Sequence, residues 1–206
     1  MPSVSVREDS KETSAVELRE VAPGSFIFEV PESLPGDVCR EMVRRFEACG
    51  PEQYAGRVGH HAALDTSVKR STDLVMSGKA HWKDLDGALF RSLVAALDAL
   101  TRRHPFFGGR FKDVGYAMQR TAPGEFYHWH IDGGSHELSH RQLVAIWYLN
   151  DVEGPGGETE FRHQSVKVKP EEGKLLLFPP FWTHEHRGAV LERGVKYIAT
   201  TWVVFA

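Results

Sequence analysis

Two segments of the N-terminal half carry apolar residues at helical spacing. The first runs from Pro35 to Glu47, and its apolar stripe is formed by Val38, Met42, Val43 and Phe46. The second runs from Asp84 to Arg103 and repeats in the same way at Leu85, Leu89, Leu93, Ala96, Leu97 and Leu100. Gly50-Pro51 follows the first segment and is typical of a helix end. The pattern predicts two amphipathic helices.

Short apolar or alternating segments dominate the second half of the chain. They predict strands over Lys112–Arg120, Glu125–Asp132, Leu143–Asn150, Glu158–His163, Lys174–Phe178 and Lys196–Phe205. Glycine and proline turn signals separate them, most clearly at Gly154-Pro155-Gly156-Gly157. An earlier strand is expected over Ser25–Val30, with Phe26, Phe28 and Val30 on one face. The chain from Glu52 to Asp73 is rich in glycine, histidine and charge, which predicts loops around weak strands.

Helices followed by many short strands predict an α+β fold with a double-stranded β-helix (jelly-roll) core. If the N-terminal helices pack on one sheet, both faces of Leu143–Leu149 can be apolar. We expect a single domain over residues 21–206, with helical support over 21–110 and the jelly-roll core over 111–206. Residues 1–20 are charged and lack periodicity, which predicts a mobile tail.

Composition excludes several classes of protein. A formal net charge of -3 over 206 residues favours neither nucleic acid nor an anionic membrane surface as a partner. The longest apolar runs have strand length, so no membrane span is expected. The first 20 residues lack the apolar segment of a secretory signal. Cys39 and Cys49 are the only cysteines, which predicts no disulfide framework and a cytoplasmic location.

His130-Ile131-Asp132 is the first candidate for chemistry. Two residues apart on a strand, an imidazole and a carboxylate point to the same face. Joined by a second histidine, they would form the two-His-one-carboxylate triad that holds non-heme Fe(II) and leaves coordination positions open. The motif alone is weak, because the chain has 11 histidines. Seven others are expected to be surface or structural residues: His60, His61, His81, His104, His136, His140 and His163.

Two histidines compete to complete the triad, about fifty residues further on. His184 and His186 are two residues apart, so both could point inward. His186 is favoured because the ten-residue interval to Lys196 allows a loop and a return strand. His184 is then a loop residue or a support for the ligands. His128 shares the inward parity of His130 on a regular strand and is a lesser competitor.

Lys196 is the second candidate for chemistry. It begins a strand on which Ile198, Thr200 and Trp202 share its face. A lysine that faces a barrel interior needs a partner, because an unpaired buried ammonium costs several kcal/mol. A dicarboxylate bound beside the metal would supply it. Parity alone leaves the opposite orientation open, with Lys196 in solvent.

Four sequence blocks follow one another over roughly residues 111 to 205. They are Tyr127-His128-Trp129-His130-Ile131-Asp132; Tyr148-Leu149-Asn150-Asp151-Val152 with Gly156-Gly157-Glu158-Thr159 and Phe161; Gly173-Lys174-Leu175-Leu176-Leu177-Phe178-Pro179; and His186, Val190, Gly194 and Lys196. These blocks resemble the prolyl-4-hydroxylase-like branch of the Fe(II)/2-oxoglutarate-dependent dioxygenases. Their order and intervals favour His186 as the distal histidine and an inward Lys196.

The resemblance implies a role for each matching residue. His130, Asp132 and His186 would bind Fe(II) and form the catalytic centre. Lys196 would pair with the distal carboxylate of 2-oxoglutarate, assisted by the Tyr148 hydroxyl. O2 would be the second co-substrate, ascorbate an optional reductant, and succinate and CO2 the by-products. Asp132 argues against halogenating relatives, in which a small residue replaces the carboxylate.

Substrate recognition is less specific in the sequence. Tyr127, Arg141 and Trp202 match positions that touch the target residue in enzymes resembling prolyl hydroxylases. The two aromatic side chains could form a slot for a pyrrolidine ring, and Arg141 could anchor a backbone carbonyl. They could equally be core packing and surface. Thr121 stands where this branch usually has a tyrosine that reaches the 2-oxo acid, and residues 52–76 could form a lid or plain surface.

The leading hypothesis is an oxygenase that hydroxylates an unactivated C–H bond, with a prolyl residue of a peptide or protein as the expected substrate. A free amino acid or another small metabolite is the alternative substrate. Two other classes remain open: a cupin-like dioxygenase or zinc hydrolase that uses the same ligands without 2-oxoglutarate, and a degenerate jelly-roll binding module. The last class would be expected to have lost a metal ligand.

Overall fold

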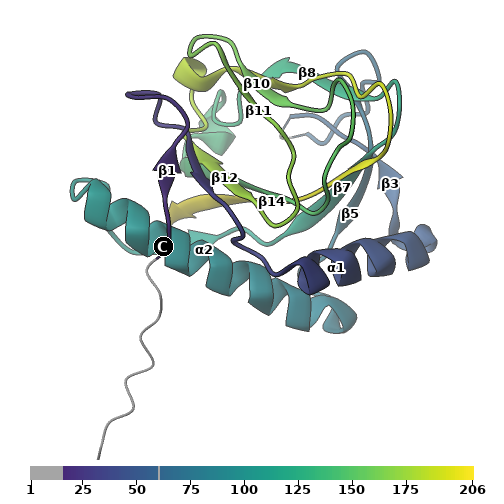
Figure 1. The fold of residues 1–206 in the computed structure, drawn as a ribbon, viewed down its shortest axis with the longest axis horizontal. Helices are drawn as coiled ribbons and strands as arrows, with labels where there is room; N and C mark the ends of the chain where they lie inside the picture. Colours follow the sequence, from purple (N-terminus) through teal and green to yellow (C-terminus); the bar gives the residue numbers. More distant parts are fainter. Residues whose placement is uncertain (1–15, 60) are drawn as a thin grey trace, which may run out of the picture.

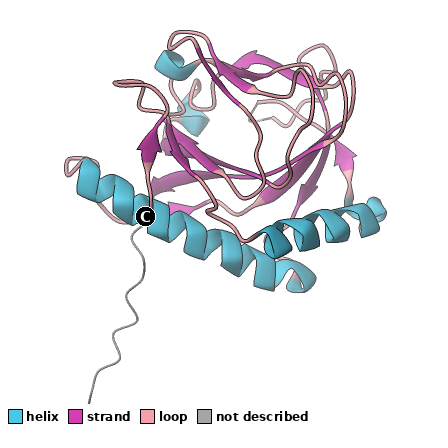
Figure 2. Ribbon diagram, in the orientation of Figure 1, coloured by secondary structure: helices cyan, strands magenta, loops and turns pink. Residues whose placement is uncertain are grey.

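Two antiparallel sheets face each other in a jelly roll, and two helices cover the outer face of the larger sheet (Figures 1 and 2). The structure is a computed structural model that describes residues 16–59 and 61–206. The α+β jelly roll predicted from the sequence is confirmed, as is the packing of the helices on one sheet. Among the described helices, none combines the length and the apolar character that crossing a bilayer requires.

The chain passes back and forth between the two sheets several times. In the described residues the larger sheet has nine strands, in the order β1 (Arg19–Glu20), β2 (Phe28–Val30), β12 (Leu175–Phe178), β9 (Arg141–Tyr148), β14 (Lys196–Phe205), β7 (Ala117–Thr121), β5 (Thr72–Val75) and β3 (Tyr54–Ala55), with β6 (Phe111–Asp113) beside β14. The smaller sheet has five, in the order β11 (Val166–Val168), β10 (Thr159–Phe161), β13 (His186–Gly188), β8 (Phe126–His130) and β4 (Lys69–Arg70).

The helices form where the apolar stripes predict them. Helix α1 spans Gly36–Ala48 and α2 spans Lys83–Arg103. Short 3-10 turns follow α1 (η1, Gly50–Glu52) and precede α2 (η2, Ala80–Trp82), and two more lie at η3 (His136–Leu138) and η4 (Trp182–His184). The buried side chains of the two helices join the core on the outer face of the larger sheet: Cys39, Met42, Phe46, Leu85, Leu89, Leu93, Ala96 and Leu100.

Strand β9 explains why apolar residues occupy both faces of one segment. Leu143, Ala145 and Trp147 pack with the helices, in the core outside the barrel. Val144, Ile146 and Tyr148 point the other way, into the space between the sheets. Each face therefore buries against a different layer, as expected for a sheet covered on both sides. The interior face is the one that reaches the candidate site.

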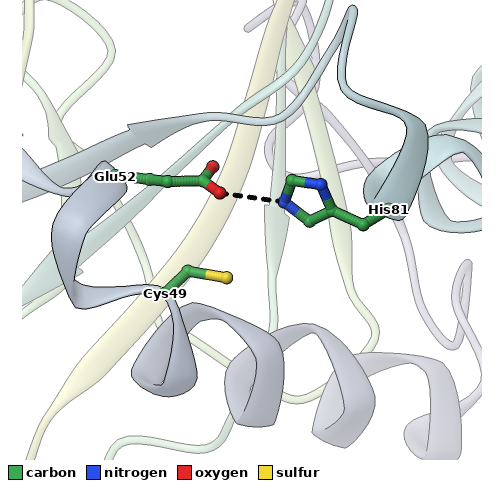
Figure 3. A group of neighbouring side chains, drawn as sticks. All are labelled: Cys49, Glu52 and His81. Atoms are coloured by element: carbon green, nitrogen blue, oxygen red, sulfur yellow. Dashed lines mark ion pairs between the residues drawn. The ribbon is translucent and has the colours of Figure 1, made fainter.

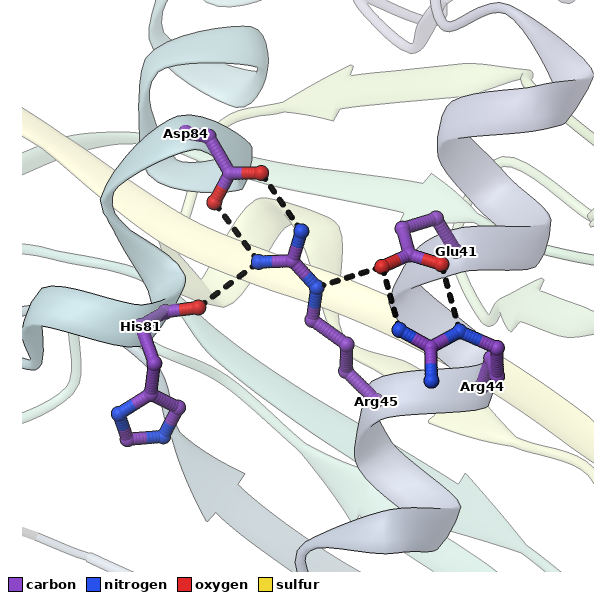
Figure 4. Close-up of polar contacts among 5 residues, drawn as sticks. All are labelled: Glu41, Arg44, Arg45, His81 and Asp84. Carbon is purple, nitrogen blue, oxygen red and sulfur yellow. Dashed lines mark hydrogen bonds and ion pairs between the residues drawn. The ribbon is translucent and has the colours of Figure 1, made fainter.

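A polar cluster ties α1 to the start of α2 (Figure 4). The Arg45 guanidinium donates two hydrogen bonds of 2.7 Å to the carboxylate of Asp84 and one of 2.7 Å to the backbone oxygen of His81. Glu41 accepts hydrogen bonds from both Arg44 and Arg45. Bidentate arginine contacts fix an orientation as well as a distance, so the end of α1 and the turn η2 are held together.

Three local predictions differ from the structure. Ser25–Val30 is not one strand: β2 begins at Phe28, and Phe26 adopts a φ of 54° and is half exposed. Lys112–Arg120 is split into β6 and β7 around Gly115, whose φ of 88° breaks the strand. The expectation of a mobile tail over residues 1–20 is wrong at its end, because Arg19–Glu20 pairs with β2; residues 1–15 lie outside the described residues.

The chain between η1 and α2 is more regular than the sequence suggests. Strand β4 pairs with β8 in the smaller sheet, and β5, one residue later, pairs with β7 in the larger sheet. The chain thus crosses from one sheet to the other at Ser71, whose hydroxyl is bound to Asp73 at 2.7 Å. This crossing forms one wall of the cavity between the sheets.

Candidate metal centre

A β-bulge sets the side chains of β8. His186 pairs with His130, but Gly188 pairs with Tyr127, so two residues of β8 oppose one of β13. A bulge of this kind reverses the alternation of side chains. Tyr127 and His130, three residues apart, therefore lie on the same face, and their rings stack at 3.5 Å. The parity predicted for His128 is wrong for this reason: His128 is exposed.

The structure brings together the three residues that the sequence predicts as metal ligands. One nitrogen or oxygen from each of His130, Asp132 and His186 lies within 4.8 Å of the others. The Asp132 carboxylate is 3.3 Å from Nε2 of His186. Asp132 follows the end of β8, and its backbone N–H donates to the oxygen of Pro180 at 3.0 Å. Two imidazoles from adjacent strands and a carboxylate just beyond one of these strands are the donor set that suits Fe(II).

Backbone oxygens orient both imidazoles toward a common point. The Nδ1 of His130 is 2.7 Å from the oxygen of His128, and the Nδ1 of His186 is 3.0 Å from the oxygen of His184. Donation from Nδ1 leaves the lone pair of Nε2 on the side of Asp132, which is the arrangement of histidine ligands in metal sites. His184 itself binds the oxygen of Ser25 through Nε2 at 2.9 Å. It therefore supports the site from outside it.

The protonation states fit the same role. Burial, the neighbouring His186 and Lys69 outweigh Asp132 and lower the pKa of His130 to about 3, so its ring is neutral at pH 7. Burial disfavours the ionised form of Asp132, but His186, His130 and Arg141 together hold its pKa below the usual range. A neutral imidazole and an ionised carboxylate are the forms that bind a metal.

Lys196 points into the cavity that the three candidate ligands share. The side chain is buried, and its ammonium donates to the oxygen of Gly157 at 2.8 Å. Within the described residues it forms no ion pair. Burial lowers the pKa of Lys196 to about 8, partly offset by Glu158. A buried ammonium of this kind would be stabilised by an anion bound in the cavity.

The cavity lies between the sheets and has a volume of about 180 Å³. Four cationic side chains reach its lining, Arg57, Lys69, Arg141 and Lys196, against one carboxylate, Asp132. His130 and His186 lie on the smaller sheet, with Asp132 just after it, and Lys196 lies on the larger sheet. An anion that bridges the two would therefore span the gap between the sheets.

Comparison with known families agrees with this geometry. The model of the 2OG-Fe(II) oxygenase superfamily matches residues 116–204, which run from the residue before β7 into β14 and include His130, Asp132, His186 and Lys196. This part of the chain is therefore similar to a 2OG-Fe(II) oxygenase domain. The superfamily takes its name from its two cofactors, 2-oxoglutarate and Fe(II).

Solved structures share the fold of this oxygenase domain. The chain is 19% identical to a viral collagen prolyl hydroxylase from Paramecium bursaria Chlorella virus-1 in complex with 2-oxoglutarate, covering 91% of this chain and 100% of that one with a TM-score of 0.66. A Trichoplax adhaerens prolyl hydroxylase is 16% identical, with 88% of this chain and 84% of that chain covered and a TM-score of 0.72. A Pseudomonas putida prolyl-4-hydroxylase is 22% identical, with 87% of this chain and 92% of that chain covered and a TM-score of 0.63. Comparison with curated protein sequences gives no match.

The three residues that the sequence predicts for substrate binding gather at one side of the oxygenase cavity. Tyr127, Arg141 and Trp202 all line it. The Arg141 guanidinium lies 3.7 Å from the ring centre of Trp202 and donates to the backbone oxygen of Asp132 at 2.8 Å. Arg141 thus touches both a candidate metal ligand and an aromatic wall. Its alternative prediction as a surface residue is wrong, since its side chain is only 15% exposed.

Tyr148 is placed less directly than the resemblance implies. Its hydroxyl is buried and lies 2.7 Å from the Thr159 hydroxyl, and it is Thr159 rather than Tyr148 that lines the cavity. Burial raises the pKa of Tyr148, so the hydroxyl keeps its proton. Thr121 is buried opposite Lys196 in the β7–β14 pair and accepts a hydrogen bond from Gln119 at 3.3 Å. Gln119 reaches the lining, whereas Thr121 does not.

Sequence reasoning did not single out the residues that the β4 region adds. Lys69 is buried, binds Asp73 at 2.7 Å and lies 5.1 Å from the ring centre of Tyr127. Arg57 and Gly59 also border the cavity, so residues 52–76 contribute to its wall. The sequence signal for this part of the wall was the Lys69-Arg70-Ser71-Thr72-Asp73 segment, in which two basic residues and one acidic residue lie on either side of Ser71-Thr72. His60 lies outside the described residues.

Proposed function

We propose that this chain is an Fe(II)- and 2-oxoglutarate-dependent hydroxylase, with a prolyl residue of a peptide or protein as its leading substrate. One observation carries the proposal. The His130, Asp132 and His186 group shares a cavity with a buried lysine that has no ionic partner among residues 16–59 and 61–206. A metal site alone would not require that lysine, whereas a chelating diacid would require both.

The chain's own residues would hold the two cofactors. His130, Asp132 and His186 would bind Fe(II), which, with 2-oxoglutarate and O2, supplies the oxidising power for C–H hydroxylation. Lys196 would bind the distal carboxylate of 2-oxoglutarate. The Thr159 hydroxyl, held by Tyr148, is placed on the same lining to donate a further hydrogen bond. The apolar Ile146 and Ile198 also line the cavity and would exclude water from the diacid's chain.

Arg141 would act on the metal ligand and on the substrate. Its contact with the backbone of Asp132 fixes the carboxylate, while its face against Trp202 keeps the guanidinium at the cavity wall. Tyr127 stacks on His130 and restricts the same side. A pyrrolidine ring that enters between Tyr127 and Trp202 would present its C–H bonds to the metal position.

Descriptions of the structural neighbours support a prolyl substrate. One is a viral collagen prolyl hydroxylase, and another is a prolyl hydroxylase in complex with a peptide fragment of a hypoxia-inducible-factor degradation domain. Peptide substrates need an open approach, and Arg57, on the wall, is exposed. The described cysteines are both free, which supports a reducing compartment such as the cytoplasm.

A free amino acid or small acidic metabolite is the second candidate substrate. The observation that favours it is the excess of positive charge: with Lys196 assigned to 2-oxoglutarate, Lys69 paired with Asp73 and Arg141 paired with Asp132, Arg57 remains at the wall. The Arg57 guanidinium could bind a substrate carboxylate.

The decisive experiment is anaerobic titration of the protein with Fe(II) and 2-oxoglutarate. A weak visible charge-transfer band is expected in the wild type and is expected to disappear in Asp132→Ala, because the carboxylate ligand is lost. A Leu64→Ala variant serves as a matched control, since Leu64 is 64% exposed and lies outside the cavity lining. Absence of the band in folded, iron-loaded wild type would refute the proposal.

Succinate release then identifies the substrate. A screen of prolyl peptides and free amino acids should show which class raises succinate formation above the uncoupled level. A cupin-like dioxygenase or zinc hydrolase would instead be active without 2-oxoglutarate and indifferent to Lys196→Ala. A binding module would release no succinate.

A further inference from the structure

A second group of potential metal ligands lies at the end of α1, among residues that do not line the oxygenase cavity. Cys49, Glu52 and His81 each offer one ligand atom, and these atoms lie within 4.8 Å of one another (Figure 3). Nε2 of His81 is 3.0 Å from Oε1 of Glu52. Cys49 is the residue after α1, Glu52 lies in η1, and His81 lies in η2. Two residues next to the end of α1 and one from just before α2 are thus brought to one point.

The backbone around this group is well fixed. The N–H of Cys49 donates to the oxygen of Phe46, and the N–H of Glu52 donates to the oxygen of Cys49 at 2.9 Å. On the other side, Arg45 binds the backbone oxygen of His81 at 2.7 Å (Figure 4). The three side chains therefore extend from backbone positions that are held in place, with their ligand atoms already within 4.8 Å of one another.

We propose that Cys49, Glu52 and His81 bind a divalent transition-metal ion of the zinc type, independently of the oxygenase centre. A thiolate, an imidazole and a carboxylate form a borderline-soft donor set that suits Zn²⁺ or Co²⁺ and not Mg²⁺ or Ca²⁺. Three protein ligands leave a fourth tetrahedral position for water, because the side chain of His81 is 51% exposed. Only Cys49 of the two cysteines is accessible to an ion. Cys39 is fully buried, and burial raises the pKa of its thiol to about 12.

Lys79 is the residue that opposes such an ion. Its ammonium is 2.5 Å from Oε2 of Glu52, on the oxygen that does not face His81. Glu52 therefore has one oxygen for the lysine and one for the metal. The positive charge of Lys79 weakens binding without blocking it, so its removal should leave binding at least as tight.

Cobalt(II) provides the test, because a thiolate ligand gives a charge-transfer absorption that nitrogen and oxygen ligands do not. The oxygenase triad contains no sulfur, so the intact wild-type protein can be titrated with Co²⁺ alone. We expect a saturable thiolate-to-cobalt band whose final intensity corresponds to one cobalt-bound thiolate per chain, whether or not the oxygenase triad also takes up Co²⁺. Addition of Zn²⁺ should remove the band and should protect Cys49 from alkylation by iodoacetamide, read by mass spectrometry.

Variants separate a built site from a reactive thiol. Cys49→Ser should lose the band, and Cys39→Ala, the matched cysteine control, should keep it. Glu52→Gln and His81→Gln should each weaken Co²⁺ binding by at least about tenfold, since each removes one of three ligands, and Lys79→Met should bind at least as tightly as the wild type. Circular dichroism checks that each variant is folded.

Three results would overturn the proposal. One is a folded wild type with no thiolate band at saturating Co²⁺. Another is wild-type affinity in both Glu52→Gln and His81→Gln, which would mean an adventitious ion on a single thiol only. The third is weaker binding in Lys79→Met. None of these readouts depends on catalytic activity, so they stand apart from the proposed hydroxylase function.

Discussion

Replacement of Lys196 by methionine should have opposite effects on stability and on co-substrate binding. Methionine keeps the length of the apolar stem but removes the buried ammonium. The pKa of Lys196 is lowered from 10.5 to about 8, and each pKa unit corresponds to about 1.4 kcal/mol. The charged side chain therefore destabilises the ligand-free protein by about 3 kcal/mol at pH 7. Loss of the hydrogen bond to Gly157 destabilises the variant by about 1 kcal/mol and offsets part of this gain.

The net gain of roughly 2 kcal/mol should raise the thermal midpoint of ligand-free Lys196→Met by about 4–8 °C. The pH dependence gives a second signature. Between pH 8 and 10.5 the unfolded wild type binds the proton that the folded state has released, so wild-type stability rises with pH. The variant should lack this rise.

The effect on 2-oxoglutarate should be a loss. Removal of one partner from a buried ion pair costs roughly 3–5 kcal/mol, which corresponds to a dissociation constant about 150- to 4,000-fold higher. The charge-transfer titration measures the affinity, and differential scanning calorimetry with and without 2-oxoglutarate measures both states. A variant that is less stable than the wild type without ligand, or that binds 2-oxoglutarate normally, would refute the role given to Lys196.

Three further predictions follow from the site and the core. Affinity for 2-oxoglutarate should be constant below pH 8 and fall about tenfold per pH unit above it, as Lys196 loses its proton. Calorimetric titration across pH 6–10 measures this, and an affinity that does not change with pH would contradict the prediction. Arg141→Met should weaken Fe(II) binding about 10- to 100-fold in a chelator competition, because the Asp132 backbone loses its donor; unchanged affinity would contradict this. Leu89→Ala should cost about 2–5 kcal/mol in urea denaturation, whereas Val94→Ala, on the exposed face of α2, should cost under about 0.5.

Patterns that span many residues carried most of the fold prediction. The stripes of α1 and α2 appear at the expected positions because an amphipathic helix needs only its own sequence and one apolar surface. The two-sided apolar run of β9 likewise predicted a sheet covered on both faces. Four ordered blocks then selected His186 over His184, and the structure places His186 beside Asp132.

Single-residue backbone events were not predictable in the same way. The bulge in β8 depends on how β13 pairs across it, so the parity of His128 could not be read from its own strand. Phe26 breaks its strand with a positive φ, which propensity disfavours for an aromatic residue. The wall that Lys69 adds depends on a crossing between sheets at Ser71, which is a tertiary event.

The origin of the candidate groups on opposite sheets gives the cavity a fixed length. His130 and His186 belong to the smaller sheet, and Lys196 reaches over from the larger one. Facing sheets pack about 10 Å apart, and the core residues between them hold that spacing. Under the proposed function, this spacing would select co-substrates by length. A 2-oxo diacid one carbon shorter would not reach the ammonium, and one that is one carbon longer would fit only in a bent conformation.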